Sequence, residues 1–244
     1  MHVMHAPAGR HAALLATALA AAAAAPAALR AQLPTPLAAP GPRAGLIAGL
    51  SSATVGGSDA VFDAPAEQGL SKKRRNGFVA GGYLTFPFVA GLPISLRPEL
   101  LYAQKGVKVS GSLPFDNTGT SSAPYSAATK LDYLELPVLL QLDVPNAAGL
   151  RPSVYAGPSV AYLVRCRTEA TFAGSTTDEA CDAQGDGPRK FDVGGVVGGQ
   201  LGFALAGQAV GVGVRYTHGF TRFSEGSDVK NRALAVYGAI EIGR

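Results

Sequence analysis

The chain has little charge, no tryptophan and, beyond its N-terminal segment, no long apolar run. Charged residues make up 16% of its 244 residues, whereas an ordinary soluble domain carries about a quarter. No stretch past the N-terminus approaches the ~20 apolar residues of a transmembrane helix. Hydrophobic residues nevertheless reach 47%, and there are 31 glycines. This composition disfavours a helical membrane protein and leaves two all-β structures open, a soluble sandwich and a barrel whose apolar face lies in lipid.

Cysteine and histidine are also scarce. Cys166 and Cys181 lie fifteen residues apart in one polar stretch, and in an exported protein a local pair predicts a disulfide. On the chain-entropy model, closing such a loop stabilises it by roughly 3 kcal/mol. Because His218 is the only histidine beyond residue 31, the two cysteines lack the ligands of a zinc site. We therefore predict a disulfide, no metal and no cofactor.

The N-terminus has the layout of a secretory signal peptide. A weakly basic start is followed by an Ala/Leu run over residues 12–25 and by small residues with a plausible cleavage point after Ala31. We predict a signal peptide over residues 1–31 and a Pro-rich leader over residues 32–43, with a retained membrane anchor as the alternative. Removing residues 1–31 takes away two arginines and no acidic residue, which lowers the formal net charge from +4 to +2.

From Ala44 onward, large apolar residues alternate with small or polar ones. This period of two is typical of a strand with two different faces. Stretches of about ten residues also match a tilted crossing of the hydrocarbon layer. Eight such stretches are predicted: 44–54, 77–88, 94–105, 131–142, 153–164, 191–204, 209–220 and 232–242.

Charged residues fall on one face of these stretches. In residues 94–105, for example, Arg97 and Glu99 alternate with Leu96 and Leu100. If the apolar face lies against lipid, the charged face points into the barrel, where opposite charges can pair in a narrow interior. The predicted interior charge network consists of Arg97, Glu99, Glu135, Asp192 and Arg215.

The connections between the stretches alternate in length. The long ones are 55–76, 106–130, 165–190 and 221–231, and the short ones are 89–93, 143–152 and 205–208. Outer-membrane barrels have short periplasmic turns and long outer loops, whereas an immunoglobulin-like sandwich has no reason to alternate. Residues 44–244 are therefore predicted to form an all-β, eight-stranded antiparallel up-and-down transmembrane β-barrel in an outer membrane.

Five segments carry a resemblance to known proteins: LDYLELPVLLQLD (131–143), YAGPSVAYLV (155–164), FDVGGVVGGQLGF (191–203), RYTHGFTRF (215–223) and KNRALAVYGAIEIG (230–243). They resemble the outer-membrane β-barrel domain of porin-like or PorT-like bacterial proteins. The resemblance runs from about Gly45 to the C-terminus and implies an eight-stranded barrel in the outer membrane of a Gram-negative cell, without implying any activity. One departure is the C-terminus, where many such barrels end on an aromatic residue and this chain ends Ile242-Gly243-Arg244.

Two further features are candidate sites. The basic run Lys72, Lys73, Arg74 and Arg75 lies in the first predicted outer loop, where it could contact lipopolysaccharide phosphates or simply be a solvated loop. His218 could serve a lipid-modifying enzyme with Ser224 and Glu225, but these two residues lie in a predicted loop and no His-x-Ser pair occurs on the strand. Interfacial placement at the membrane rim is the simpler interpretation.

The sequence leaves several functions open. The first is a small barrel of structural, adhesive or surface-interaction type, not an enzyme, whose interior is filled by charge pairs and whose extracellular loops carry any specificity. The alternatives are a narrow porin or transport component for small solutes, a lipid-modifying enzyme, and a soluble lipocalin-like barrel. The expected partners are membrane lipids, lipopolysaccharide and the barrel-insertion machinery during biogenesis. Nucleic acid is not expected as a partner, and the protein is expected to be a monomer.

Overall fold

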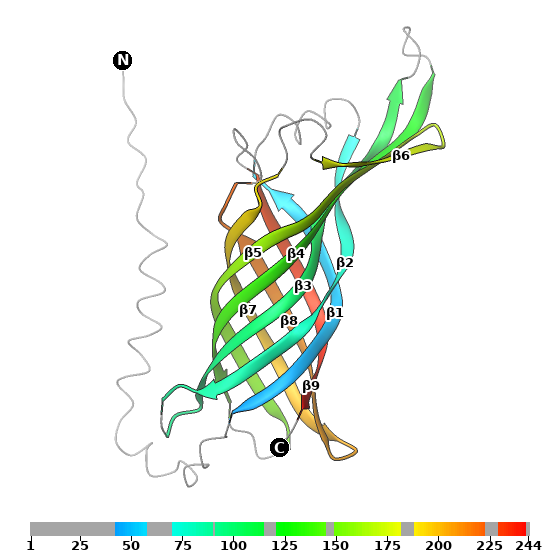
Figure 1. Cartoon of the computed structure of the whole chain (residues 1–244). Coiled ribbons are helices and arrows are strands. Elements are labelled where there is room, and N and C mark those ends of the chain that lie inside the picture. Colours follow the sequence, from blue (N-terminus) through cyan, green and yellow to red (C-terminus); the bar gives the residue numbers. More distant parts are fainter. Residues whose placement is uncertain are drawn as a thin grey trace, which may run out of the picture. The chain divides into compact units, whose positions relative to one another are not determined.

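Nine antiparallel strands form one sheet in the computed structural model. Eight of them close a ring, in which β1 to β5 follow chain order, β7 to β9 continue it, and β9 pairs with β1 (Figure 1). The structure describes residues 42–57, 70–89, 91–114, 121–144, 149–181, 188–222 and 229–242. The strands are β1 (Arg43–Gly56), β2 (Leu70–Pro87), β3 (Ile94–Pro114), β4 (Ser122–Asp143), β5 (Arg151–Phe172), β6 (Ser175–Ala180), β7 (Phe191–Leu205), β8 (Gln208–Gly219) and β9 (Lys230–Ile242). The predicted signal peptide and most of the predicted leader lie outside the described residues, so both stay predictions.

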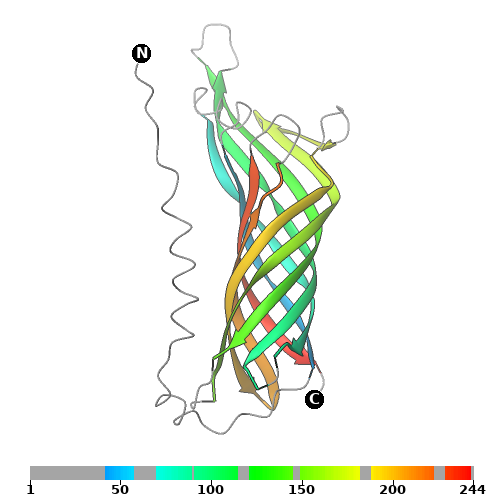
Figure 2. The same ribbon diagram turned by 90° about the vertical axis from the view of Figure 1, so that its left-hand side faces the viewer.

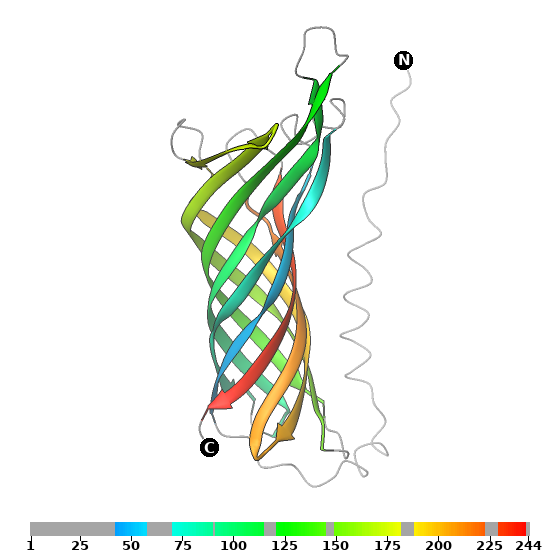
Figure 3. The same cartoon turned by 90° about the vertical axis from the view of Figure 1, so that its right-hand side faces the viewer.

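The first and last strands meet at the end of the barrel that carries the short turns. Ala44 pairs with Ile242 there, and the strands cross the barrel with a common tilt in all views (Figures 1–3). The β7–β8 turn consists of Ala206 and Gly207, with φ of 49° and 81°. Two positive φ values are those of a type I′ turn, whose twist matches that of a tight hairpin. Short turns mark the periplasmic end of outer-membrane barrels, so we refer to the opposite end as the outer end.

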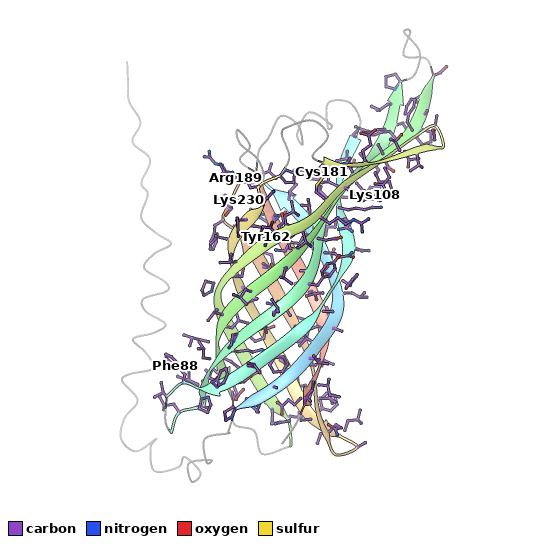
Figure 4. The ribbon with its side chains drawn as sticks, in the orientation of Figure 1. Phe88, Lys108, Tyr162, Cys181, Arg189 and Lys230 are labelled. Atoms are coloured by element: carbon purple, nitrogen blue, oxygen red, sulfur yellow. A yellow bond between two sulfur atoms is a disulfide. The ribbon has the colours of Figure 1, made fainter. Side chains whose placement is uncertain are left out.

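The alternation in the sequence translates directly into two faces of the barrel wall. On β3, Leu100 is 53% exposed and the next inward residue, Leu101, is fully buried. Exposed phenylalanines run along β2 from Phe78 to Phe88, which directly follows the strand, a span of about 23 Å along the barrel axis at ~3.3 Å per residue and ~45° tilt. This height is close to the ~25 Å apolar band of outer-membrane barrels. Figure 4 places Phe88 at the periplasmic end.

No helix within the described ranges is long and apolar enough to cross a membrane.

The outer ends of β2 to β5 extend well beyond the predicted stretches. Most of residues 106–130, predicted as a loop, belong to β3 and β4, and much of residues 165–190 belongs to β5 and β6. These extensions continue the same sheet past the barrel and, together with β6, are called the projecting sheet (Figure 1). Prediction failed here because small and polar residues, which are also typical of loops, predominate in the projecting sheet; all six residues of β6 are exposed.

The predicted disulfide is confirmed. Cys166 of β5 is bonded to Cys181, which directly follows β6, and their Cα atoms lie 5.4 Å apart. β6 pairs with β5 alone, through a turn at Ala173 and Gly174 with positive φ. The disulfide therefore fixes the free end of this hairpin to β5 at the point where the projecting sheet leaves the barrel.

Candidate functional site: a filled interior beneath a basic outer rim

Two arginines and one glutamate form the centre of the barrel interior. Arg97 and Glu99 lie on β3 with inward parity, and their Nε and Oε1 atoms are 2.8 Å apart. Arg215 of β8 reaches across the barrel, with its Nη1 atom 2.7 Å from Oε2 of Glu99. Arg97 is 1% exposed and Glu99 is 2% exposed. One carboxylate thus bridges two guanidinium groups that belong to strands on different sides of the ring.

Two tyrosine rings contact the Arg97 guanidinium, and a third tyrosine contacts one of them. Its Cζ atom lies 4.0 Å from the ring centroid of Tyr83 and 5.2 Å from that of Tyr155, both within the range of a cation–π contact. The hydroxyl groups of Tyr155 and Tyr237 are 2.8 Å apart, and Arg97 donates to the Gln141 side chain at 3.0 Å. Charge, aromatic surface and amide groups together fill the middle of the barrel.

A second set of polar contacts lies nearer the outer end. Lys105 Nζ is 2.5 Å from Oε1 of Glu135 and 5.1 Å from the ring centroid of Tyr133. Asn231 donates to Asp192 at 2.9 Å and to the Tyr133 hydroxyl at 3.3 Å. The buried cations are Arg97, Lys105 and Arg215, and the inward buried anions are Glu99, Glu135 and Asp192.

The space between these groups is small. The cavity lined by Lys105, Glu135 and Arg215, together with Ser51 and Thr217, leaves about 20 Å³ for the centre of a water molecule. Such a volume holds about one water. A hydrated solute does not fit into it without breaking the ion pairs.

The periplasmic rim is held by charge as well. Arg43, the first residue of β1, contacts Asp143 at 3.0 Å and Glu241 at 3.1 Å. Arg151 lies 3.7 Å from the other oxygen of Glu241. These pairs join the start of β1 to the end of β9 and to the last residue of β4.

The structure brings only some of the predicted interior residues into direct contact. Arg97, Glu99 and Arg215 form one cluster, Glu135 pairs with Lys105, and Asp192 pairs with Asn231. The partners missed from sequence all have inward parity. They are Lys105, Asn231, Gln141, Gln200, Tyr83, Tyr133, Tyr155 and Tyr237.

The basic run was placed wrongly from sequence. Lys72, Lys73, Arg74 and Arg75 lie within β2, not in a loop. Arg74 pairs with Val107, which packs inside the outer mouth with Val55 and Val229. Because neighbouring residues of a strand point to opposite faces, Lys72 and Arg74 lie on the inner face and Lys73 on the outer face. The prediction was wrong because four successive charged residues are typical of a loop, whereas here they belong to β2.

His218 lies on the outward face at the outer end of β8. Its ring centroid is 5.6 Å from that of Phe220 and 6.3 Å from that of Tyr216. Tyr162 and Phe191 form a similar outward aromatic pair at 5.1 Å, and Tyr162 lies toward the outer end in Figure 4. These rings have the position of the aromatic girdle that flanks the apolar band. Ser224 and Glu225 lie outside the described residues.

No group of three or more His, Cys, Asp or Glu side chains suited to a metal ion occurs in the described parts of the chain.

A closed antiparallel ring with an apolar outer wall and a polar, filled interior defines a transmembrane β-barrel. The family described as "Outer membrane protein beta-barrel domain" matches residues 39–225. The chain belongs to this family, and the protein is located in the outer membrane, among its lipids.

Three solved structures are similar to this chain at low sequence identity. Neisserial surface protein A (NspA) is 12% identical, with a TM-score of 0.40, and the match covers 83% of this chain and 100% of NspA. Ail, the attachment invasion locus protein of Yersinia pestis, is 10% identical, with a TM-score of 0.40 and the same coverage. OprG from Pseudomonas aeruginosa is 12% identical, with a TM-score of 0.39, and the match covers 83% of this chain and 95% of OprG. No curated protein matches the chain.

Proposed function

We propose that this protein is a non-conducting surface barrel of structural or adhesive type that acts without catalysis. The observation that carries the proposal is the filled interior. Glu99 bridges Arg97 and Arg215 across the barrel axis, and Lys105 pairs with Glu135 nearer the outer end. Moving a solute past them would separate buried charges, and breaking a buried ion pair costs about 3–5 kcal/mol.

The projecting sheet formed by the outer ends of β2 to β5 together with β6 is the surface that would carry specificity. It stands beyond the barrel on the outer side (Figures 1 and 3), and the disulfide between Cys166 and Cys181 ties its last strand to β5. A constrained surface loses less conformational entropy on binding than a free loop does. This favours a preformed interaction surface over a flexible loop that becomes ordered only on binding.

Lipopolysaccharide is the lipid partner that we propose for the outer rim. The outward cations above the aromatic girdle include Lys73 on β2, Lys108 on β3 and Arg167 on β5. At the periplasmic rim, Arg43 and Arg151 are instead paired with acidic residues. A positive outer rim suits the phosphate groups of the outer leaflet by charge attraction. The membrane would thus hold the barrel at a defined height.

Conductance in planar lipid bilayers tests the non-conducting barrel directly. The refolded protein should produce no reproducible single-channel steps at potentials of either sign, since the pairs above block the interior. Steps that appear with the protein and are absent from a detergent-only control would overturn the proposal in favour of the narrow porin. Incubation with lipopolysaccharide should leave its acyl chains unchanged by mass spectrometry, and loss of an acyl chain would instead favour the lipid-modifying enzyme.

A further inference from the structure

Lys73 and Lys108 lie directly opposite each other on neighbouring strands. They are paired residues of the β2–β3 ladder and both are exposed. The adjacent pair, Arg74 and Val107, faces the inner side of the mouth, so Lys73 and Lys108 share the outward face. Figure 4 places Lys108 at the outer end, where the projecting sheet leaves the barrel.

Like charges in directly opposite positions destabilise a sheet, and no other described residue relieves this pair. Lys130, on the same outward side, is paired with Glu169, and Arg167 is paired with Asp178 at 2.8 Å. Neither Lys73 nor Lys108 forms an ion pair within the described ranges. Two uncompensated cations are thus held side by side on a rigid ladder.

Protection of a free sheet edge explains only one of the two lysines. Residues 70–74 of β2 pair with β3 and not with β1, whose ladder with β2 ends at Arg75, and lysine on such an edge discourages pairing with other chains. Lys108 does not lie at an edge, because it pairs with Lys73 on one side and Ala128 on the other. Edge protection therefore gives no reason for the charge of Lys108.

The height of the pair above the apolar band supplies that reason. Tyr102 on β3 stacks on Phe78 at 5.4 Å and lies at the upper edge of the band. Lys108 lies six residues further along β3, which corresponds to about 14 Å along the barrel axis. That is the level of phosphorylated sugars just outside the acyl chains of the outer leaflet, where an anion between the two ammonium groups would be stabilised.

We propose that Lys73 and Lys108 together bind a phosphate group on the sugar portion of lipopolysaccharide. The inference rests on the proposed lipopolysaccharide association and assigns it to one position on the barrel. It also divides the basic run by face: Lys73 contacts the lipid, and Lys72 and Arg74, on the inner face of the mouth, do not.

The test compares two double variants of the full-length barrel, purified and refolded in detergent micelles. K73Q/K108Q removes the proposed pair, and K190Q/K230Q removes two lysines from the β7 and β9 side of the outer end, where Figure 4 places Lys230 away from Lys108. Heat-modifiable gel mobility first establishes that each variant is folded. Affinity is then measured by calorimetry for lipopolysaccharide, for lipopolysaccharide stripped of phosphate and for inorganic phosphate.

K73Q/K108Q should weaken binding of intact lipopolysaccharide by about tenfold, and K190Q/K230Q by less than about threefold. The difference should vanish with the stripped lipid, and inorganic phosphate at the same concentration should not compete. Equal losses in the two variants, or an undiminished difference with stripped lipid, would overturn the assignment to this pair. Competition by inorganic phosphate would show a site for free anions instead. If the unmodified protein does not bind lipopolysaccharide at all, the association proposed above fails together with the site.

Discussion

The two faces of the barrel wall reverse the arrangement of a soluble protein. Arg97 and Glu99 are almost completely buried, whereas Leu50, on the outward face of β1, is 76% exposed. In lipid, an exposed leucine is already in an apolar solvent, so apolar surface does not need to collapse inward. The interior can then hold charge, provided that every charge has a partner. The paired inner charges of this protein therefore stabilise its structure, and its outer leucines are exposed because the surrounding lipid is apolar.

The largest effect should come from removing one interior charge. Glu99→Gln leaves Arg97 and Arg215 buried without their shared carboxylate and should lower the free energy of unfolding by about 3–5 kcal/mol. Urea titration of the refolded barrel in lipid vesicles measures this. Glu169→Gln is the control, because its partner Lys130 is partly exposed and such pairs contribute less than about 1 kcal/mol. Equal effects at the two positions would show that the interior is well hydrated.

A charge on the lipid side should have a smaller effect that depends on depth. Leu136→Lys introduces an ammonium group near the middle of the apolar band, at a position 52% exposed, and should destabilise by about 2–4 kcal/mol. Val164→Lys places the same group near the outer edge and should cost about 1 kcal/mol or less. The same vesicle titration applies. Equal losses of stability in the two variants would show that Leu136 and Val164 do not lie at different depths of the apolar band.

Two adjacent glycines of β7 provide a sharper comparison of the faces. A Cβ at Gly198 would lie 2.5 Å from the Tyr155 ring and from the Val214 carbonyl oxygen, whereas at Gly199 the nearest atom is 3.4 Å away. Gly198→Ala should therefore destabilise by about 1–3 kcal/mol, and Gly199→Ala by less than about 0.5 kcal/mol. Unfolding midpoints of the two variants measure the difference. A larger effect for Gly199→Ala would contradict the assignment of inward and outward faces.

The smallest effect is expected in the β7–β8 turn, outside both faces. Ala206 has φ of 49°, a left-handed conformation that alanine adopts at a cost and asparagine tolerates. Ala206→Asn should stabilise the barrel by about 0.5 kcal/mol. Ala204→Asn, within β7, should not stabilise it, and a loss of stability in Ala206→Asn would argue against the type I′ turn.

Most of the barrel could be predicted from the sequence because lipid and a narrow interior impose a strict period of two. All eight barrel strands and the parity of Arg97 and Glu99 follow from it, whereas the disulfide follows from the local spacing of the two cysteines in an exported protein. The projecting parts of β3 to β5 and all of β6 could not be predicted, since their small and polar residues are also typical of loops. Lys73 and Lys108 illustrate the same limit, because their 35-residue separation conceals that they are neighbours.

The sequence by itself determined which residues face lipid and which face inward, since side chains in a strand must alternate whatever the strand pairs with. Only the tertiary structure decided which inward charges meet. Ring closure brings Arg215 of β8 to Glu99 of β3, 116 residues away. Glu135 then pairs with Lys105, and Asp192 pairs with Asn231. Strand register and barrel diameter set those distances, and both arise from the closure of the whole sheet rather than from any one strand.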